Sequence, residues 1–108
     1  MFLAVIAADR PGLQALRAET KQRHMRHLDG GAPGVRVLQS GPLLSPDGSE
    51  RGSLIVLKAD SVAGAQSFVD ADPYNQAGLF ETVEIHPWLW RRGNPYLEEE
   101  AVSAAAAT

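Results

Sequence analysis

The sequence predicts an α+β domain with the element order β-α-β-β-α-β, in which both helices lie on one face of an antiparallel sheet. Three observations predict it. Four short runs of apolar and β-branched residues have the length of strands. Two segments have the length and residue spacing of helices. Turn-forming Gly, Pro, Asp and Ser residues separate these segments.

The first half of the chain is predicted to form a strand, a helix and a second strand. Residues 2–8 are a short apolar run with Val and Ile, which is typical of a central strand. Residues 9–12 form a turn whose proline suits the start of a helix. The helix covers residues 13–29, because two glycines and a proline follow it. Residues 35–40 form the second strand, and the Gly-Pro pair after them ends it.

The second half is predicted to form two strands around the second helix. Residues 53–59 form the third strand, and Asp60 or Ser61 caps a helix over residues 62–71. Residues 72–78 form a short helical turn or a structured loop. Residues 82–88 form the fourth strand, with Val83 and Ile85 on one face.

This element order is that of the ferredoxin-like, or split βαβ, arrangement. One sheet face then needs a cover, and we expect a homodimer of the dimeric α/β-barrel type. The domain is predicted to cover residues 1–90. Residues 91–108 are expected to form a flexible tail, because they contain an acidic run and an alanine run. Alternatively, this tail docks on the partner subunit through Tyr96 and Leu97.

Composition narrows the classes of function. A chain of 108 residues is one domain, and the lack of cysteine excludes disulfides and Cys-based zinc sites. The net charge of −3 argues against binding to nucleic acid. The apolar N-terminal run is too short to span a membrane and lacks the basic start of a signal peptide. We therefore expect a cytoplasmic protein without a nucleic-acid or membrane partner.

The first helix carries histidine where a core-facing helix normally carries leucine. At about 100° per residue, seven side chains share one stripe roughly 60° to either side of Leu13. They are Leu13, Leu16, Arg17, Thr20, His24, His27 and Leu28. An unpaired buried polar group is costly, so His24 is expected to be hydrogen-bonded, liganded or catalytic. The stripe begins apolar and becomes polar, which indicates that the helix borders a cavity.

Structural and metal-binding interpretations compete with this one. His24 fits the core as a hydrogen-bonded histidine, and His27 can interact with the last carbonyls of the helix. His24 and His27 also have a spacing at which both reach one ion, with Asp72 as a third ligand. This spacing is a weaker signal than His-Glu-x-x-His, and we predict no metal site.

The Asp-Pro-Tyr sequence at residues 72–74 has two interpretations. Asp72 can cap a short helical turn that has Pro73 at its first position and ends at Gly78. Asp72 can also hold the His24 ring, which fixes the tautomer and makes His24 a general base. One carboxylate can do both, and Tyr74 would add a wall and a phenolic donor.

Gly41 and Pro42 also have two interpretations. A glycine at this position permits close approach of a ligand or of a neighbouring subunit. Alternatively, the pair is only a turn that ends the second strand.

Together, these segments resemble the YCII-related family of small YciI-like bacterial proteins. The resemblance covers about residues 1–90, in FLAVIAAD, RHMRHL, SGPL, SLIVLKAD, FVDADPYNQAGLFETVEI and HPW. DADPY followed by AGLF is its most specific part. The resemblance implies a ferredoxin-like α+β fold, usually dimeric, with a His–Asp pair at His24 and Asp72. It also implies a pocket lined by Gly41, Pro42 and Tyr74, and lyase-like or dehydrohalogenase-like elimination.

Three functions follow from these observations. The first is an enzyme in which His24, supported by Asp72, acts as a general acid and base on a small organic metabolite, giving elimination or isomerisation. Arg17 would then bind a substrate carboxylate. The second is a non-catalytic small-ligand-binding or regulatory module. The third is a cofactor-free monooxygenase of the dimeric α/β-barrel type.

Two further classes of function are disfavoured. An RNA-recognition domain would have aromatic residues on its central strands, and the predicted third strand has none. The chain has no phosphate-binding loop and no nucleotide fingerprint, so no cofactor is expected.

Overall fold

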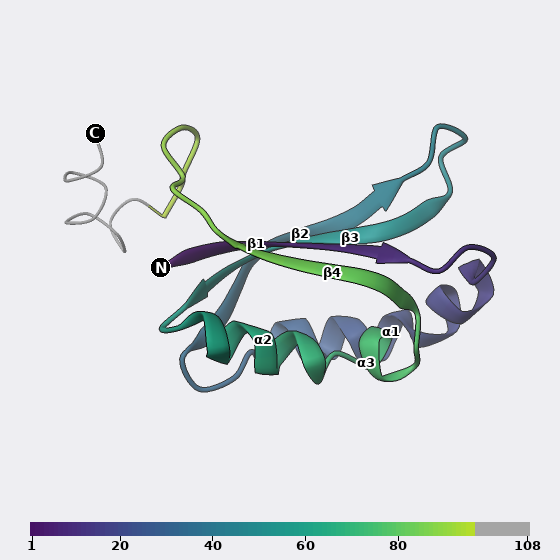
Figure 1. Cartoon of the computed structure of the whole chain (residues 1–108), viewed down its shortest axis with the longest axis horizontal. Helices are drawn as coiled ribbons and strands as arrows, with labels where there is room; N and C mark the ends of the chain where they lie inside the picture. Colours follow the sequence, from purple (N-terminus) through teal and green to yellow (C-terminus); the bar gives the residue numbers. More distant parts are fainter. Residues whose placement is uncertain (97–108) are drawn as a thin grey trace.

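The structure, a computed structural model that describes residues 1–96, contains one antiparallel sheet with the strand order β2-β3-β1-β4 (Figure 1). The order of elements along the chain is β-α-β-β-α-β, with an additional single-turn helix before the last strand. This is the ferredoxin-like fold that the sequence predicts. The elements are β1 (Phe2–Asp9), α1 (Gln14–Gly30), β2 (Val35–Leu44), β3 (Glu50–Ala59), α2 (Val62–Asp70), α3 (Pro73–Gln76) and β4 (Phe80–Pro87).

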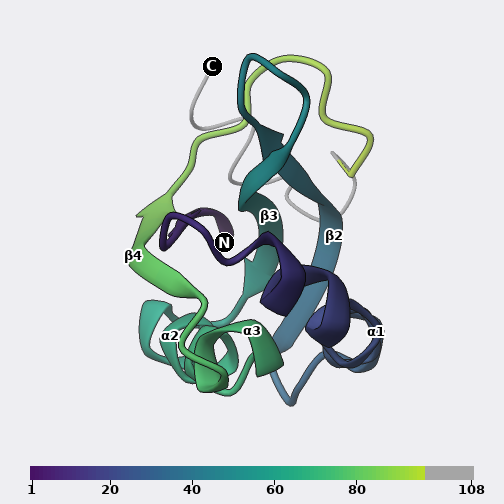
Figure 2. The same ribbon diagram turned by 90° about the vertical axis from the view of Figure 1, so that its right-hand side faces the viewer.

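All three helices lie on the same face of the sheet, with α1 on the β2 side and α2 and α3 on the β4 side (Figure 2). Successive side chains of the central strands point to opposite faces of the sheet, and this produces the arrangement. Leu3 and Val5 of β1 point toward the helices and are fully buried. Their partners in the sheet, Leu57 and Ile55, are buried in the same core together with Phe68 of α2. Each such side chain stabilises the fold by about 1.5–3 kcal/mol.

Local capping residues set the ends of the two shorter helices. The Ser61 hydroxyl accepts a hydrogen bond from the Gly64 N–H at 3.0 Å and begins α2. Asp72 caps α3, Pro73 occupies its first turn, and Gly78 follows with a φ of 79°. The sequence predicted the cap at Asp72 and left Asp60 or Ser61 for α2, of which the structure selects Ser61.

Strand β2 is longer than predicted, and the prediction that Gly41 and Pro42 end it was wrong. Both residues lie within β2, where they pair with Leu54 and Ser53 of β3. Because β2 is an edge strand, a proline without an N–H does not interrupt the ladder. Apart from Gly41 and its two chain neighbours, no atom of residues 1–96 lies within 4 Å of the position of a Gly41 Cβ, so close packing in this part of the chain does not require the glycine.

The boundaries of the third and fourth strands differ less from the predicted ones. The third strand begins at Glu50 and the fourth at Phe80, both earlier than predicted. The pairing of these extra residues with neighbouring strands extends both elements. Strand β2 also contains a bulge, because Val37 pairs with Leu57 and Gln39 with Val56.

The segment after β4 folds over one end of the face that the helices leave open. Trp90 is buried and packs edge-to-face on Phe2, with ring centroids 5.7 Å apart. The Tyr96 hydroxyl donates a hydrogen bond to the carbonyl of Leu38, the bulge residue, at 3.0 Å. Tyr96 therefore contacts the sheet of its own chain, whereas residues 97–108 of the predicted tail, Leu97 among them, lie outside the described residues. Within residues 1–96, no helix is long and apolar enough to cross a bilayer.

A substitution at Gly52 of β3 tests the close approach of the two central strands. A Cβ at Gly52 would collide with the carbonyl oxygen of Ala7 in β1. We expect Gly52→Ala to lower the free energy of unfolding by about 1–3 kcal/mol, the usual cost of overpacking, in urea denaturation. Gly41→Ala is the matched control in open space and should change it by less than about 0.5 kcal/mol. Equal effects of the two substitutions would contradict this interpretation.

Candidate active site

A groove of about 810 Å³ lies between α1 and the edge strand β2, and the floor of this groove includes Ser53 and Ile55 of β3. Five of the six site residues that the sequence predicts line this groove. They are Arg17, His24, Gly41, Pro42 and Tyr74. Asp72, the sixth, is in contact with His24 and is 1 % exposed.

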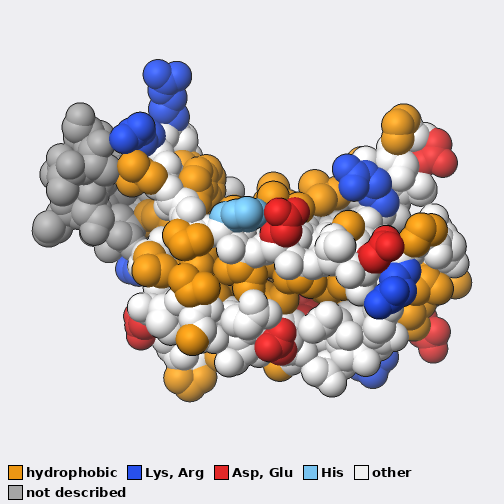
Figure 3. All heavy atoms as spheres, in the orientation of Figure 1, with side chains coloured by type: hydrophobic (Ala, Val, Ile, Leu, Met, Phe, Trp, Pro, Cys, Tyr) orange, Lys and Arg blue, Asp and Glu red, His pale blue; other side chains and the backbone are white. Residues whose placement is uncertain are grey.

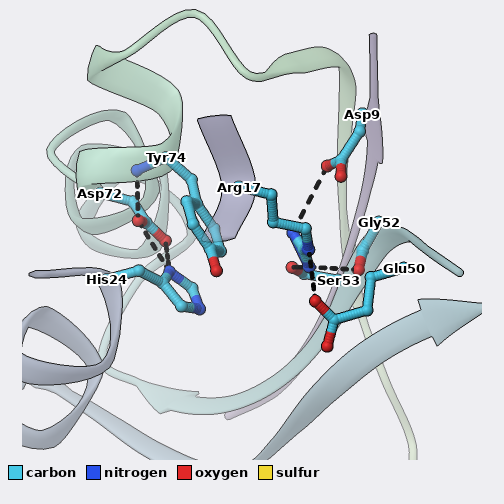
Figure 4. Close-up of polar contacts among 8 residues, drawn as sticks. All are labelled: Asp9, Arg17, His24, Glu50, Gly52, Ser53, Asp72 and Tyr74. Carbon is cyan, nitrogen blue, oxygen red and sulfur yellow. Dashed lines mark hydrogen bonds and ion pairs between the residues drawn. The ribbon is translucent and has the colours of Figure 1, made fainter. Parts of the chain in front are cut away.

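The structure brings His24 and Asp72 into direct contact (Figure 4). Nδ1 of His24 lies 2.8 Å from both Oδ1 and Oδ2 of Asp72. Because a carboxylate only accepts, the neutral imidazole carries its proton on Nδ1 and its lone pair on Nε2. Nε2 has no hydrogen-bond partner within residues 1–96. A lone pair oriented in this way, beside a groove, is what a general base requires.

The same Asp72 carboxylate caps α3. Its Oδ1 accepts a hydrogen bond from the Tyr74 N–H at 2.9 Å, and the Asp72 carbonyl accepts one from the Gln76 N–H at 2.9 Å. Pro73 occupies the first turn of this helix. Asp72 thus caps α3 and contacts the His24 imidazole at once, because its oxygens accept from the backbone and from a ring N–H.

Tyr74 fixes the plane of the His24 ring. The two rings stack with centroids 3.9 Å apart and planes 16° from parallel. Nε2 of His24 and the Tyr74 hydroxyl point to the same side, away from Asp72 (Figure 4). Burial raises the pKa of Tyr74, although Arg17 opposes this, so the hydroxyl stays protonated at neutral pH. It makes no hydrogen bond within residues 1–96 and is free to donate one to a ligand.

Arg17 completes the stack, because its guanidinium carbon lies 4.6 Å from the centre of the Tyr74 ring. Figure 4 shows Tyr74 between His24 and Arg17. Such a cation–π contact is worth about 0.5–2 kcal/mol and holds the phenol in place. Arg17 therefore positions Tyr74 and, through it, the imidazole.

The remaining contacts of Arg17 are also with protein groups. Its Nη2 donates to the Gly52 carbonyl at 2.5 Å and to the Ser53 hydroxyl at 2.6 Å. Its Nη1 lies 3.5 Å from Asp9, and its Nε lies 3.6 Å from Glu50. Two carboxylates thus compensate the charge of a side chain that is 4 % exposed. This geometry favours a positioning role for Arg17 over the predicted contact with a substrate carboxylate.

Sequence periodicity gave an incomplete picture of the buried face of α1. The predicted stripe begins with Leu13 and Leu16, but both are only half-buried, and Arg17 and Thr20 are the buried residues there. The sequence did not identify the carboxylates and the hydroxyl around Arg17. Their one signal was a charged or polar residue at the end of a strand, which is too common to be specific.

His27 has a structural role in the fold. Its Nε2 donates a hydrogen bond to the Phe68 carbonyl at 2.8 Å, and its ring stacks on the Phe68 ring at 4.3 Å. These contacts hold α1 against α2. The described part of the chain contains no group of three His, Asp or Glu side chains that could hold a metal ion.

Residues 1–89 match the family model of the YCII-related domain. The chain belongs to the YCII-related family. Proteins named YciI from Escherichia coli O6:H1 and from Shigella flexneri are each 28% identical to it over 94 residues. That alignment covers 82% of this chain and 96% of each relative.

Solved structures share the fold. The dehydrochlorinase TftG of Burkholderia phenoliruptrix, which acts on 5-chloro-2-hydroxyhydroquinone and was solved with 2,5-dihydroxybenzoquinone, is 27% identical with a TM-score of 0.74. The match covers 87% of this chain and 99% of TftG. SnoaB, a cofactor-independent oxygenase of Streptomyces nogalater, is 14% identical with a TM-score of 0.52, over 87% of this chain and 95% of SnoaB. At that identity, the likeness to SnoaB shows the fold alone.

The Asp9 carboxyl beside Arg17 predicts a pH-dependent contribution to stability. Burial raises the pKa of Asp9 above its ordinary 3.8; Arg17 opposes the rise and Glu50 adds to it. A raised pKa means that the folded state binds the proton more tightly, so ionisation of Asp9 disfavours folding. The free energy of unfolding of the wild type, minus that of Asp9→Asn, should therefore decrease as pH rises from about 3 to 7.

Urea denaturation at a series of pH values measures this difference. Glu81→Gln, on the exposed surface of β4, is the control for loss of a carboxylate. A difference that increases with pH for Asp9→Asn would show that the ion pair with Arg17, and not burial, dominates.

Proposed function

We propose that this protein is an enzyme that moves a proton on a small organic metabolite, in an elimination or isomerisation reaction, with His24 as the general base. One observation carries the proposal: Asp72 holds the imidazole so that Nε2 is unpaired beside a groove of about 810 Å³. A groove of this size accommodates a small metabolite. As proposed, the reaction needs no cofactor and takes place in the cytoplasm.

His24 would begin the reaction by removing a proton from carbon or oxygen of the substrate. The proton goes to Nε2, and the imidazolium that forms is stabilised by the Asp72 carboxylate at Nδ1. In an elimination, the released electron pair forms a new double bond and the leaving group departs with its own pair. In an isomerisation, His24 returns the same proton to another atom.

Tyr74 would stabilise the charge that develops on substrate oxygen. Its hydroxyl points to the same side as Nε2 and is protonated at neutral pH, so it can donate a hydrogen bond to an enolate or phenolate oxygen. The fixed stack on His24 means that this donor does not need to reorganise during the reaction.

The comparisons support elimination as the reaction class. TftG, which is 27% identical, removes chloride from a hydroxylated ring, as its name states.

Two alternative functions remain: a ligand-binding or regulatory module, and a cofactor-free monooxygenase of the same fold. The unpaired Nε2 favours the base-catalysed reaction, because ligand binding alone does not require a carboxylate-oriented imidazole.

The test is turnover of 5-chloro-2-hydroxyhydroquinone, the substrate in the name of TftG, measured as chloride release. We expect His24→Asn to lower the rate by about 10²–10⁴-fold, the usual contribution of a general base. His27→Gln is the matched control and should retain the rate, because His27 contacts the Phe68 carbonyl and not the groove. The thermal midpoints of both variants establish that each remains folded.

Other results would select the alternatives. Full activity of His24→Asn would remove His24 as the base. Binding of 2,5-dihydroxybenzoquinone without chloride release by the wild type would favour a binding module. Oxygen consumption with the hydroquinone would favour a monooxygenase.

We also propose that the open sheet face joins a second copy of this chain. Ile6 and Leu54 face each other across β1 and β3 on this side, and both are more than one third exposed. Figure 3 shows this face as a hollow with hydrophobic side chains along it and one histidine and one acidic side chain among them, between the β2–β3 hairpin and the segment after β4. Covering such a face with its own copy is the simplest way to bury it.

Light scattering after size-exclusion chromatography measures the oligomeric state. We expect a dimer for the wild type and a monomer for Leu54→Glu, because the substitution would bury an unpaired charge in the interface. Val62→Glu, at an equally exposed apolar position on α2, should remain dimeric. A wild type that elutes as a monomer would overturn the proposed interface.

A further inference from the structure

One cation of the groove has no protein partner. Lys21 lines the groove from α1, one helical turn before His24, and its side chain is exposed. No hydrogen bond or ion pair joins its ammonium group to any of residues 1–96. Residues three apart on a helix share a face, so Lys21 and His24 border the same space.

The other charges of the groove do not neutralise Lys21. Glu50 is paired with Arg17 at 3.6 Å. Asp29 lies two turns farther along α1, which is about 12 Å along the helix axis. Arg17 itself is buried among protein acceptors, so Lys21 is the groove cation of α1 that remains available to a ligand.

The two ends of the groove differ in polarity. One end holds the ionic groups beside Lys21. There Arg17 donates a hydrogen bond to the Ser53 hydroxyl, and Ser53 pairs with Pro42 of β2. The opposite end is lined by Leu28 and Val35, which belong to the apolar core, and the exposed side chains of Asp29 and Arg36 border it. His24 lies between the two ends in the order of α1. A ligand that fills the groove thus meets a positive charge at Lys21, then the imidazole, then an apolar wall with one acidic and one basic side chain at its border.

We infer that Lys21 binds an anionic oxygen of the ligand, and that the groove takes small organic acids with an apolar body, such as carboxylates or acidic hydroxyquinones. The anionic oxygen lies at Lys21 and the body extends toward Leu28. This inference rests on the proposed function only in placing the reacting atom at Nε2 of His24. Lys21 replaces Arg17 as the ligand-binding cation, because the charge of Arg17 is already compensated.

Titration calorimetry with 2,5-dihydroxybenzoquinone tests the inference. This compound is a vinylogous acid and is anionic at neutral pH, whereas its dimethoxy analogue has the same ring without the charge. We expect the anion to bind the wild type more tightly than the analogue, and Lys21→Gln to weaken its binding by about tenfold. Lys21→Arg should bind within about threefold of the wild type.

Arg23→Gln is the matched control, because it removes one positive charge from an exposed position of α1 outside the groove. It should leave binding unchanged. Equal losses in Lys21→Gln and Arg23→Gln would overturn the inference, since net charge would then explain both. Unaltered binding to Lys21→Gln, equal affinity for the neutral analogue, or no binding of the anion to the wild type would also overturn it.

Chloride release by His24→Asn separates this inference from the proposed function. Loss of turnover in His24→Asn together with unaltered binding to Lys21→Gln would retain His24 as the base and remove Lys21 from the site. Weaker binding to Lys21→Gln together with full turnover in His24→Asn would retain the anion site and remove the base.

Discussion

The Asp72 carboxylate is the group on which the site depends. It accepts from the Tyr74 N–H, which begins α3, and from Nδ1 of His24, which comes from α1. One buried charge therefore joins two helices that are far apart in the sequence. Loss of either partner would leave part of a carboxylate buried without a donor, which is costly. Fold and site are coupled at this point, because the hydrogen bonds that satisfy the charge also orient the imidazole.

The stack of His24, Tyr74 and Arg17 extends this constraint across the interior. Tyr74 is 2 % exposed, so its ring is held by core packing as well as by its two neighbours. Arg17 in turn is anchored on β3 through Ser53 and the Gly52 carbonyl. The imidazole is thus positioned relative to the sheet by three consecutive contacts. A side chain held in this way loses little conformational entropy when a ligand binds.

The two cations of α1 at the groove have different environments and, we infer, different tasks. Arg17 is surrounded by Asp9, Glu50 and backbone acceptors, so its charge contributes to the architecture. Lys21 is one turn farther along the helix, exposed and without a partner in residues 1–96. The unequal polarity of the groove follows from this difference. A groove with unequal ends suits a ligand with one charged end better than a neutral ligand.

The sequence by itself determined the order of elements and the cap at Asp72, limited the cap of α2 to Asp60 or Ser61, and predicted the two residues of the His–Asp contact. The element order and the caps depend on local spacing and on side-chain chemistry, which a single chain displays directly. The contact between His24 and Asp72, which are 48 residues apart, was expected because a buried polar side chain needs a partner. Only the tertiary structure decided that Gly41 and Pro42 lie within β2, because a strand ends where its partner stops pairing. It also decided that Arg17 is compensated within the protein. The groups around Arg17 come from β1 and β3, and only the folded sheet brings them within bonding distance of α1.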